Sequence, residues 1–246
     1  MRFYFAGKTE RDRHLAAILQ QKGHAIAPSP PGDVLILPLP RSAVPSGMQL
    51  PSGQKIVCGL TDATFDTLAD VHRWQVFRPL EDTQYLQENA ALTAEDAIHL
   101  AAMHLTRALS DCHILVTGYG RIGKRLTELF RAAGAAVTVA ARRKESRSEA
   151  GADSITIEEI AGRLRETDVV FNTVPAHILA EETLCHASPG TLPVELSSAP
   201  YGIDRQAAER LGLLYRLESG IPGRYCPESA AQTLFRFLKR EGLIHE

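Results

Sequence analysis

The sequence lacks an excess of charge of either sign. Lys and Arg together number 27 and Asp and Glu number 29, which gives a formal net charge of −2. Proteins that bind nucleic acid or an anionic membrane over a broad face usually carry a basic excess. The composition therefore argues against nucleic acid and against a membrane surface as partners.

The sequence also lacks an apolar run of membrane-spanning length, and its first residues pass at once into a charged stretch. A transmembrane helix needs about 20 apolar residues, and a secretory signal has an apolar core of its own. We therefore expect a cytoplasmic protein. Its 246 residues, 44% of them hydrophobic, suffice for one or two domains with a substantial core.

Paired cysteines and metal-binding patterns are missing too. The four cysteines lie far apart, and none belongs to a C-x-x-C pair: Cys58, Cys112, Cys185 and Cys226. The nine histidines form no H-E-x-x-H or similar spacing. We expect reduced, structural cysteines and no bound metal.

A glycine motif stands in mid-chain, and its members are Gly118, Tyr119, Gly120, Arg121, Ile122 and Gly123. It follows an apolar, β-branched run over 113–117 and precedes a helical pattern over 124–133, so it lies where a strand turns into a helix. There Gly118 permits the tight turn, Gly120 lets the backbone approach a pyrophosphate, and Gly123 lets the helix pack closely. The helix start also offers free N–H groups to phosphates.

A structural glycine turn is the alternative to a dinucleotide site. A second expected strand over 136–140 follows Gly134, a residue suited to a helix C-terminus. The two strands and the helix complete a βαβ unit of roughly 30 residues. The sequence therefore favours dinucleotide binding.

A cluster of cations follows the second strand. Position 142, which lies 19 residues after Gly123 (142 − 123), is where an NAD site usually places Asp or Glu; here Arg142, Arg143 and Lys144 follow one another. Guanidinium groups suit a 2′-phosphate, which a carboxylate would repel. We predict NADP rather than NAD, with a solvated basic helix start as the alternative.

The order of expected elements indicates an α/β protein with two domains. Strands are expected over 2–6, 33–37, 55–58 and 74–77 in the first half and over 168–171, 192–196 and 213–217 in the second. We expect a C-terminal Rossmann domain, a doubly wound parallel sheet, and a smaller N-terminal flavodoxin-like domain, joined by a long helix. The predicted parts are 1–88, the linking helix in 89–110, the NADP-binding domain 111–226, and a helix in 227–246 that packs back on the first domain.

Polar residues follow two of the later strands. Asn172, Thr173, Val174 and Pro175 follow the strand over 168–171, and Ser197 follows the strand over 192–196. Ligands of open parallel sheets lie beyond the carboxyl ends of the strands, so we expect these residues to line the cofactor. Helix caps are the alternative use of such residues.

The order of these motifs resembles the family of dipicolinate synthase A subunits from endospore-forming bacteria. The resemblance rests on residues 118–123, 141–142, 172–175, 220–227 and 89–95. It implies a sporulation enzyme that dehydrogenates a dihydrodipicolinate-like intermediate to pyridine-2,6-dicarboxylate with NADP. The implied partners are a small dicarboxylate substrate, further copies of the chain in a homo-oligomer, and the flavoprotein-like B subunit of dipicolinate synthase. The chain departs from the family where Gly7 to Arg11 replace a Gly-Gly-Asp-x-Arg stretch.

The resemblance also implies substrate-side residues. Asn89, Thr93 and Glu95 match the family pattern. Glu95 is our candidate for proton transfer, with a carboxylate at a helix start as the alternative. Arg224 and, from the first domain, Arg11 are our candidates for holding substrate carboxylates, with a solvent-facing arginine as the alternative for Arg224.

Two other functions remain open from the residues. An NADP-dependent 2-hydroxy acid dehydrogenase would share the two-domain layout, but it normally needs a positioned His with a carboxylate partner and an Arg, and no such set is evident. A non-catalytic protein that senses NADP or acts as a scaffold would share the dinucleotide site.

Overall fold

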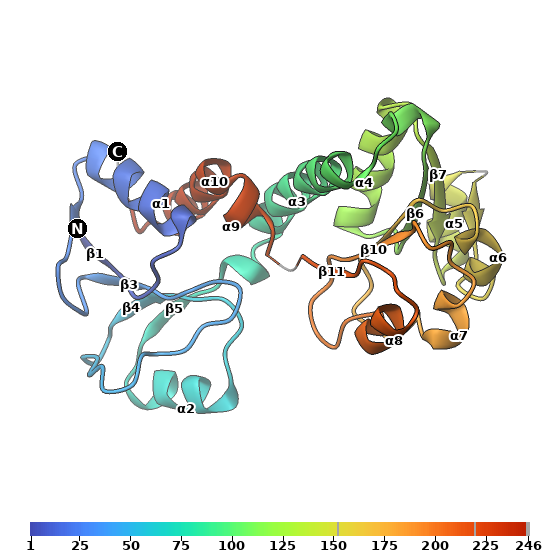
Figure 1. Ribbon diagram of the computed structural model, residues 1–246. Coiled ribbons are helices and arrows are strands. Elements are labelled where there is room, and N and C mark those ends of the chain that lie inside the picture. Colours follow the sequence, from blue (N-terminus) through green and yellow to red (C-terminus); the bar gives the residue numbers. More distant parts are fainter. Residues whose placement is uncertain (152, 219, 245–246) are drawn as a thin grey trace. The chain divides into compact units, whose positions relative to one another are not determined.

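The computed structural model of the chain describes residues 1–151, 153–218 and 220–244. They divide into two compact units, each built on one parallel sheet (Figure 1). Unit 1 comprises Met1–Leu92 and Pro222–Glu246, and unit 2 comprises Thr93–Ile221. The boundary falls inside the long helix α3 (Thr83–His104), which contributes residues to both units.

The sheet of unit 1 has five parallel strands in the order β2-β1-β3-β4-β5. Their bounds are β1 (Arg2–Phe5), β2 (Ala25–Ile26), β3 (Val34–Ile36), β4 (Lys55–Val57) and β5 (Gln75–Phe77). This is the strand order of flavodoxin-like folds. The predicted flavodoxin-like domain is confirmed.

Helices cover both faces of this sheet (Figure 1). On one face, Val34 and Ile36 pack in a cluster with α1 (Glu10–Gln21) and α10 (Pro227–Arg240). On the other face, Leu35 packs in a second cluster with α2 (Ala63–Val71). Alternate side chains of a strand point to opposite faces, so a continuous apolar strand is the expected sequence for a sheet covered on both sides.

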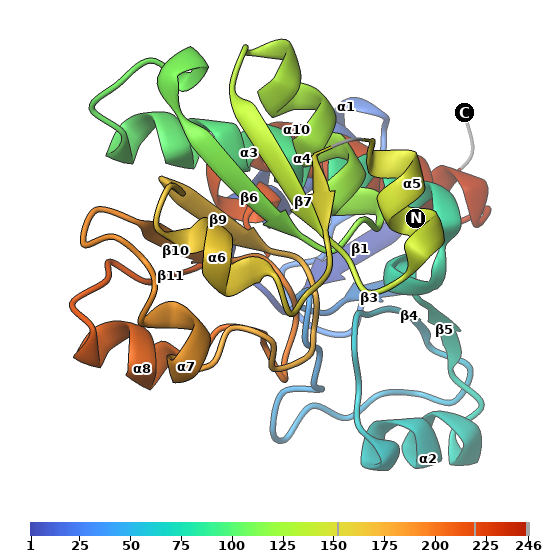
Figure 2. The ribbon, with the colours of Figure 1, turned by 90° about the vertical axis from the view of Figure 1, so that its right-hand side faces the viewer.

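The sheet of unit 2 has six parallel strands in the order β11-β10-β9-β6-β7-β8 (Figure 2). Their bounds are β6 (His113–Thr117), β7 (Ala136–Ala140), β8 (Ser154–Ile155), β9 (Val169–Asn172), β10 (Leu192–Glu195) and β11 (Arg216–Leu217). Numbered from β6 onward, this is the 3-2-1-4-5-6 order of a Rossmann fold. The predicted doubly wound domain is confirmed.

Helices also lie on both faces of the unit 2 sheet. Phe130 of α4 (Arg121–Ala132) packs against Phe171 of β9, with ring centroids 5.3 Å apart. On the opposite face, Val170 belongs to a cluster formed with three short helices: α6 (Ile160–Leu164), α7 (Glu181–Leu184) and α8 (Arg205–Arg210). Helix α5 (Lys144–Ala150) connects β7 to β8. The remaining short helices are η1 (Pro79–Glu81), η2 (Leu109–Asp111) and α9 (Pro222–Tyr225).

The long helix differs from its predicted span. We expected it within 89–110, whereas α3 starts at Thr83, where the Asp82 carboxylate accepts a hydrogen bond from the N–H of Tyr85 at 2.6 Å, and ends at His104. Asp is a good helix N-cap, so a start signal was present in the sequence at Asp82, seven residues before the predicted segment 89–110. None of the described helices is long and apolar enough to span a bilayer.

Candidate functional site

The carboxyl edge of the unit 2 sheet contains a topological switch point. Strands β6 and β9 are neighbours, but the chain leaves β6 toward β7 on one side and leaves β9 toward β10 on the other. In open α/β sheets, ligands bind beyond the carboxyl ends of the strands at such a point. The loops after β6 and β9 are the glycine motif and residues 173–175.

The three glycines of the motif have different surroundings. Gly118 has a φ of +87°, and a Cβ there would lie 2.6 Å from the Thr173 hydroxyl oxygen. A Cβ on Gly123 would lie 2.2 Å from the carbonyl oxygen of Gly118, so this residue allows α4 to pack on the turn. A Cβ on Gly120 would meet no atom within 4 Å. The structure thus has a tight turn, a close helix contact, and open space at the middle glycine.

Helix α4 begins at this open glycine. Gly120 is its N-cap residue, and no side chain caps the helix. The first N–H groups of an α-helix have no partner inside the helix, so they are available to an anion. Arg121 is exposed, and the Lys124 ammonium lies 5.5 Å from the Tyr119 ring centroid and 2.5 Å from a Glu149 carboxylate oxygen.

The predicted cation cluster lies at the carboxyl end of β7. Arg142, Arg143 and Lys144 are exposed, and none of them forms an ion pair with any residue that the structure describes. Arg147 instead has a structural role, because its guanidinium donates to the carbonyls of Ala141 and Arg142, both at 2.8 Å. The turn is therefore held by Arg147, while the three preceding cations are left for solvent or a ligand.

Asn172, at the end of β9, is fully buried and hydrogen-bonded on both sides of its amide. Its oxygen accepts from the Thr117 hydroxyl at 2.6 Å and from the N–H of Val174 at 3.2 Å. Its nitrogen donates to the Val174 carbonyl at 2.9 Å and to a carboxylate oxygen of Glu195 at 2.6 Å. Asn172 therefore fixes the loop that follows its own strand.

Glu195, at the end of β10, is the other centre of this network, and it is fully buried. Besides the Asn172 amide, it accepts hydrogen bonds from the backbone N–H groups of Ser197 at 3.0 Å, Gly202 at 2.8 Å and Ile203 at 2.9 Å. Burial, aided by the negative charge of Glu195, raises the pKa of the Tyr215 hydroxyl to about 12. Glu195 was not among the candidates from the sequence. A charged residue at the end of an apolar strand was the signal that could have indicated it.

The other predicted residues of these loops have differing exposure. Pro175 is exposed, while Ser197 is buried and its hydroxyl donates to the Ser198 carbonyl at 3.2 Å. The Thr173 hydroxyl donates to the Thr117 carbonyl at 2.8 Å. Thr173 and Ser197 thus use their hydroxyls inside the protein, which is the local structural use that the sequence left open beside cofactor contact.

The two predicted residues of α3 that belong to unit 2 differ in burial. Thr93 is buried and Glu95 is exposed. The alternative interpretation of Glu95, a carboxylate at a helix start, is wrong, because α3 starts at Thr83 and the helix dipole acts on the first turn. Asp96, next to Glu95, is a buried carboxylate that no motif of the sequence indicated.

Asn89 and Arg224 belong to unit 1. Asn89 is half-buried in α3, and Arg224 is exposed. Arg224 lies in the short helix α9 rather than in a loop, and its guanidinium carbon lies 5.7 Å from the Tyr225 ring centroid.

Arg11 lies in the first turn of α1 and is nine-tenths buried. Its nearest carboxylate is that of Asp12, with an N–O distance of 3.9 Å, and its Nε finds no hydrogen-bond partner among the described residues. Burial raises the pKa of the Tyr85 hydroxyl, and the charge of Arg11 opposes that rise. A buried guanidinium N–H without an acceptor is costly unless an anion supplies one.

The divergent stretch before Arg11 still forms a regular helix start. The Thr9 hydroxyl accepts from the N–H of Asp12, and the Asp12 carboxylate accepts from the N–H of Thr9, which makes a capping box. Thr9 stands where the family pattern has Asp, and both residues are good N-caps. The substitution therefore keeps the helix start and the position of Arg11 in it.

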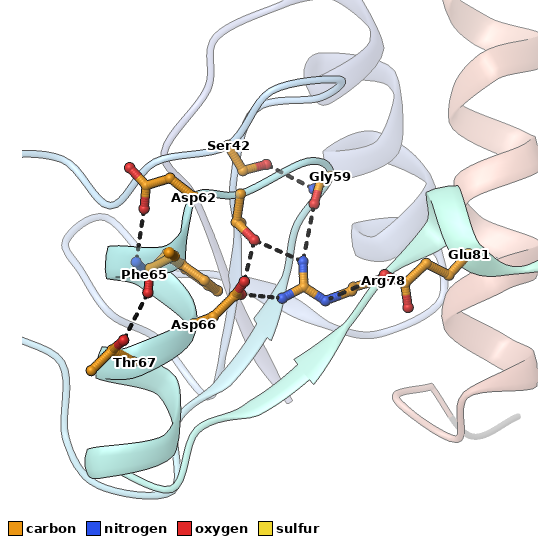
Figure 3. Close-up of polar contacts among 10 residues, drawn as sticks. Ser42, Gly59, Asp62, Phe65, Asp66, Thr67, Arg78 and Glu81 are labelled. Carbon is orange, nitrogen blue, oxygen red and sulfur yellow. Dashed lines mark hydrogen bonds and ion pairs between the residues drawn. The ribbon is translucent and has the colours of Figure 1, made fainter.

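A second polar cluster at the carboxyl edge of the unit 1 sheet surrounds Arg78 (Figure 3). Its guanidinium donates to the Asp66 carboxylate at 2.6 Å, the Thr61 hydroxyl at 2.9 Å and the Gly59 carbonyl at 3.4 Å. These residues line a cavity of about 350 Å³. Because Arg78 is already paired, we interpret it as a structural residue. It connects the end of β5 to the loop after β4 and to helix α2.

In residues 1–151, 153–218 and 220–244, no group of three or more His, Cys, Asp or Glu side chains is arranged to hold a metal ion.

Part of the chain is similar to a known family of dehydrogenase domains. Residues 77–197 match the family model described as D-isomer specific 2-hydroxyacid dehydrogenase, NAD binding domain. The match includes the glycine motif, the cation cluster, Asn172 and Glu195. The chain is thus a dehydrogenase-like protein whose second unit is of the type that binds a nicotinamide cofactor.

A curated relative is the A subunit of dipicolinate synthase of Bacillus subtilis, which is 29% identical over 188 residues. The chain resembles the dipicolinate synthase A subunits. The family resemblance predicted from the sequence is confirmed by this relative. The aligned segment covers 75% of this chain and 63% of the relative, which is less than two thirds of the relative's length.

Two solved structures have the same fold. The dipicolinate synthase A subunit from Bacillus halodurans has a TM-score of 0.84 at 22% identity, covering 98% of this chain and 97% of that one. The dipicolinate synthase A subunit from Bacillus subtilis has a TM-score of 0.82 at 24% identity, covering 99% and 96%. At these identities the likeness concerns the fold, and it holds over nearly the whole length of each chain.

Proposed function

We propose that this chain is an NADP-dependent dehydrogenase that forms dipicolinate from a dihydrodipicolinate-like intermediate. The observation that carries the proposal is the switch point of unit 2. Open space at Gly120, an uncapped start of α4 and exposed cations after β7 occur together there. The substrate is taken from the resemblance to the dipicolinate synthase A subunits.

The residues present suit NADP. The backbone at Gly120 and the start of α4 would hold the pyrophosphate, and Arg142, Arg143 and Lys144 would hold the 2′-phosphate. The loop of residues 172–175 and the region of Ser197 would border the nicotinamide half. When bound, the oxidised cofactor accepts a hydride from the substrate.

The protein's own residues then have to hold a small dicarboxylate and manage one proton. Arg11 and Arg224 would hold the two carboxylates as planar forks, and Arg11 has an unpaired buried Nε that a carboxylate oxygen would satisfy. Asn89 and Thr93 would contact the ring substituents. Glu95 would accept the proton or orient a water that does, and aromatisation supplies driving force.

We further propose a partner and a setting. The relative is named as one lettered subunit of a synthase, which implies a second, and we expect this chain to work with such a flavoprotein-like B subunit. A homo-oligomer, a cytoplasmic location and a role in sporulation complete the proposal.

The test is to mix the purified chain, with and without its presumed B subunit, with NADP⁺ and freshly generated dihydrodipicolinate. We expect NADPH absorbance to grow together with dipicolinate. Tight NADP⁺ binding without turnover under either condition would contradict the enzyme and favour the sensing or scaffold protein.

One observation favours a second candidate, an NADP-dependent 2-hydroxy acid dehydrogenase, because the matching family model carries that description. Its normal catalytic set includes a His paired with a carboxylate. In unit 2, His104 is hydrogen-bonded instead to Arg216 at 2.9 Å and to the Leu100 carbonyl at 2.8 Å. A panel of short 2-hydroxy acids with NADP⁺ decides this: turnover of any of them faster than of dihydrodipicolinate would support the second candidate.

A further inference from the structure

Glu195 has a position in unit 2 that no assigned role explains. Its carboxylate is fully buried, and all four of its hydrogen-bond partners are N–H donors: those of the Asn172 side chain and of the Ser197, Gly202 and Ile203 backbones. Burying a carboxylate is costly, and full hydrogen bonding offsets that cost. An apolar residue of similar size would leave the Asn172 amide and three backbone N–H groups without an acceptor, so the carboxylate holds the surrounding loops rather than filling space.

The contacts lead from Glu195 to the glycine motif. Glu195 binds the amide of Asn172, which holds both the N–H and the carbonyl of Val174. The Val174 side chain in turn lies against the turn at Gly118, where a Cβ would be only 2.7 Å from a Val174 methyl carbon. The same carboxylate also holds the loop after its own strand, through Gly202.

The space around this loop is filled. A Cβ on Gly202 would lie 2.4 Å from the Asn172 side-chain nitrogen and 2.8 Å from the carbonyl oxygens of Val174 and Ala176. The preceding residue, Tyr201, has a φ of +58°, which is uncommon for a residue with a side chain. The loops after β9 and β10 are thus locked to each other, with Glu195 as their shared acceptor.

We infer that Glu195 is a positioning residue for the nicotinamide half of the cofactor, acting through Asn172 and the loops after β9 and β10. This inference rests on the proposed binding of NADP. A Rossmann sheet has two mononucleotide-binding halves, and β9 and β10 belong to the half opposite β7. Glu195 therefore governs one half of the dinucleotide site, whereas the cations after β7 govern the other.

The test compares two probes on the intact chain. One is NADP⁺, and the other is adenosine 2′,5′-bisphosphate, which keeps the 2′-phosphate and lacks the nicotinamide ribose. In Glu195→Gln, whichever way the new amide turns, its NH₂ group faces two N–H donors. We expect the Kd of NADP⁺ to rise about tenfold and that of the bisphosphate to change less than about twofold.

Two further variants accompany this one. Thr117→Val removes the hydroxyl that donates to Asn172 while keeping shape and charge, and we expect a selective rise of about threefold in the Kd of NADP⁺. If Glu195→Gln does not fold, Thr117→Val decides the question. Glu209→Gln, an exposed carboxylate of α8 paired with Arg205, is the matched control, and we expect it to change neither affinity.

The outcomes separate the inference from the proposed function. An equal loss for both probes, or an unchanged Kd for NADP⁺, overturns the positioning role while the cofactor site stands. A wild-type chain that binds neither probe overturns the proposed function and this inference with it.

Discussion

At the carboxyl edge of the unit 2 sheet, the buried side chains of Thr117, Asn172 and Glu195 satisfy one another, whereas at the corresponding edge of unit 1 the buried Arg11 keeps an Nε without an acceptor among the described residues. The exposed cations after β7 form no ion pair within the described parts of the chain, and in unit 1 the cation Arg78 is paired with Asp66. A satisfied network holds loops in one conformation, while an unsatisfied buried donor can be paired by a water or by an anion. The difference suggests a preformed cofactor edge in unit 2 and an anion-binding position in unit 1.

The largest effect is expected from the glycine motif. Gly118→Ala places a Cβ against Thr173 at a φ of +87°, so we expect a loss of about 3 kcal/mol of folding stability, several degrees in Tm, and loss of NADP⁺ binding. Gly120→Ala is the matched variant: its Cβ meets no protein atom, so Tm should stay unchanged while NADP⁺ affinity falls about tenfold or more. Thermal unfolding and titration check both. Equal losses of Tm in the two variants would contradict the different roles of Gly118, in the tight turn, and Gly120, beside the open space.

The next largest effect is expected on kcat when Glu95, the proposed proton acceptor in unit 2, is replaced. Glu95→Gln removes the base without changing size, so we expect kcat for dipicolinate formation to fall about 100-fold while the Kd of NADP⁺ stays the same. Glu128→Gln, an exposed carboxylate of α4, is the control. Unchanged turnover in the Glu95 variant would remove this residue from the mechanism.

The cations after β7 should determine the preference of the protein for NADP⁺ over NAD⁺. In the double variant Arg142→Ala and Arg143→Ala, we expect the Kd of NADP⁺ to rise about 30-fold, because two charge-assisted contacts to the 2′-phosphate are lost, and the Kd of NAD⁺ to remain the same. The double variant Arg205→Ala and Arg210→Ala removes the same number of charges from two exposed arginines, which are paired with Glu209 and Glu181, and is the control. A loss of the same size for both cofactors would show that these arginines do not read the 2′-phosphate.

Arg11 tests the unit 1 side of the comparison. We expect Arg11→Met to raise the KM for the dicarboxylate about tenfold and to leave NADP⁺ affinity unchanged. Because the Arg11 Nε is buried and unpaired, the apolar replacement should keep Tm constant or raise it. A clear drop in Tm with unchanged KM would make Arg11 a structural residue and remove the contrast between the two edges.

The smallest effect is expected in thiol labelling, which compares the buried carboxyl edge of the unit 1 sheet with the exposed surface of unit 2. Burial raises the pKa of the Cys58 thiol, directly after β4, to about 11, so at pH 8 only about one molecule in 1,000 carries the thiolate there. Cys185 in unit 2 is exposed. Labelling with a thiol reagent at pH 8 should modify Cys185 first and Cys58 only on unfolding, and Cys185→Ser should remove the fast phase. Rapid labelling of Cys58 would indicate that the unit 1 edge opens.

Local patterns were enough to predict most of the fold. The glycine motif, the strands around it and the apolar strands of both sheets follow from periodicity and turn residues, and both sheet orders agree with the predicted fold class. The two-residue strands β2 and β8 are too short to carry an alternating pattern. The start of α3 was missed because its first turns lack the small apolar stripe that marked the later part of the helix.

The candidate site was predictable only where one segment carries it. The cations at 142–144 and the loop at 172–175 are continuous in sequence. The network around Glu195 joins residues from 117 to 203, and a single Glu at a strand end does not show that three loops converge on it. In the same way, burial of Arg11 depends on packing in unit 1, which the first turn of α1 does not reveal.

The central claim is that the edge of unit 2 binds NADP in preference to NAD. Calorimetric titration of the intact chain with each cofactor tests it most directly. We expect NADP⁺ to bind at least about tenfold more tightly than NAD⁺, because Arg142, Arg143 and Lys144 stand where an acidic residue would hold the ribose of NAD. Equal affinities, or tighter binding of NAD⁺, would contradict the account.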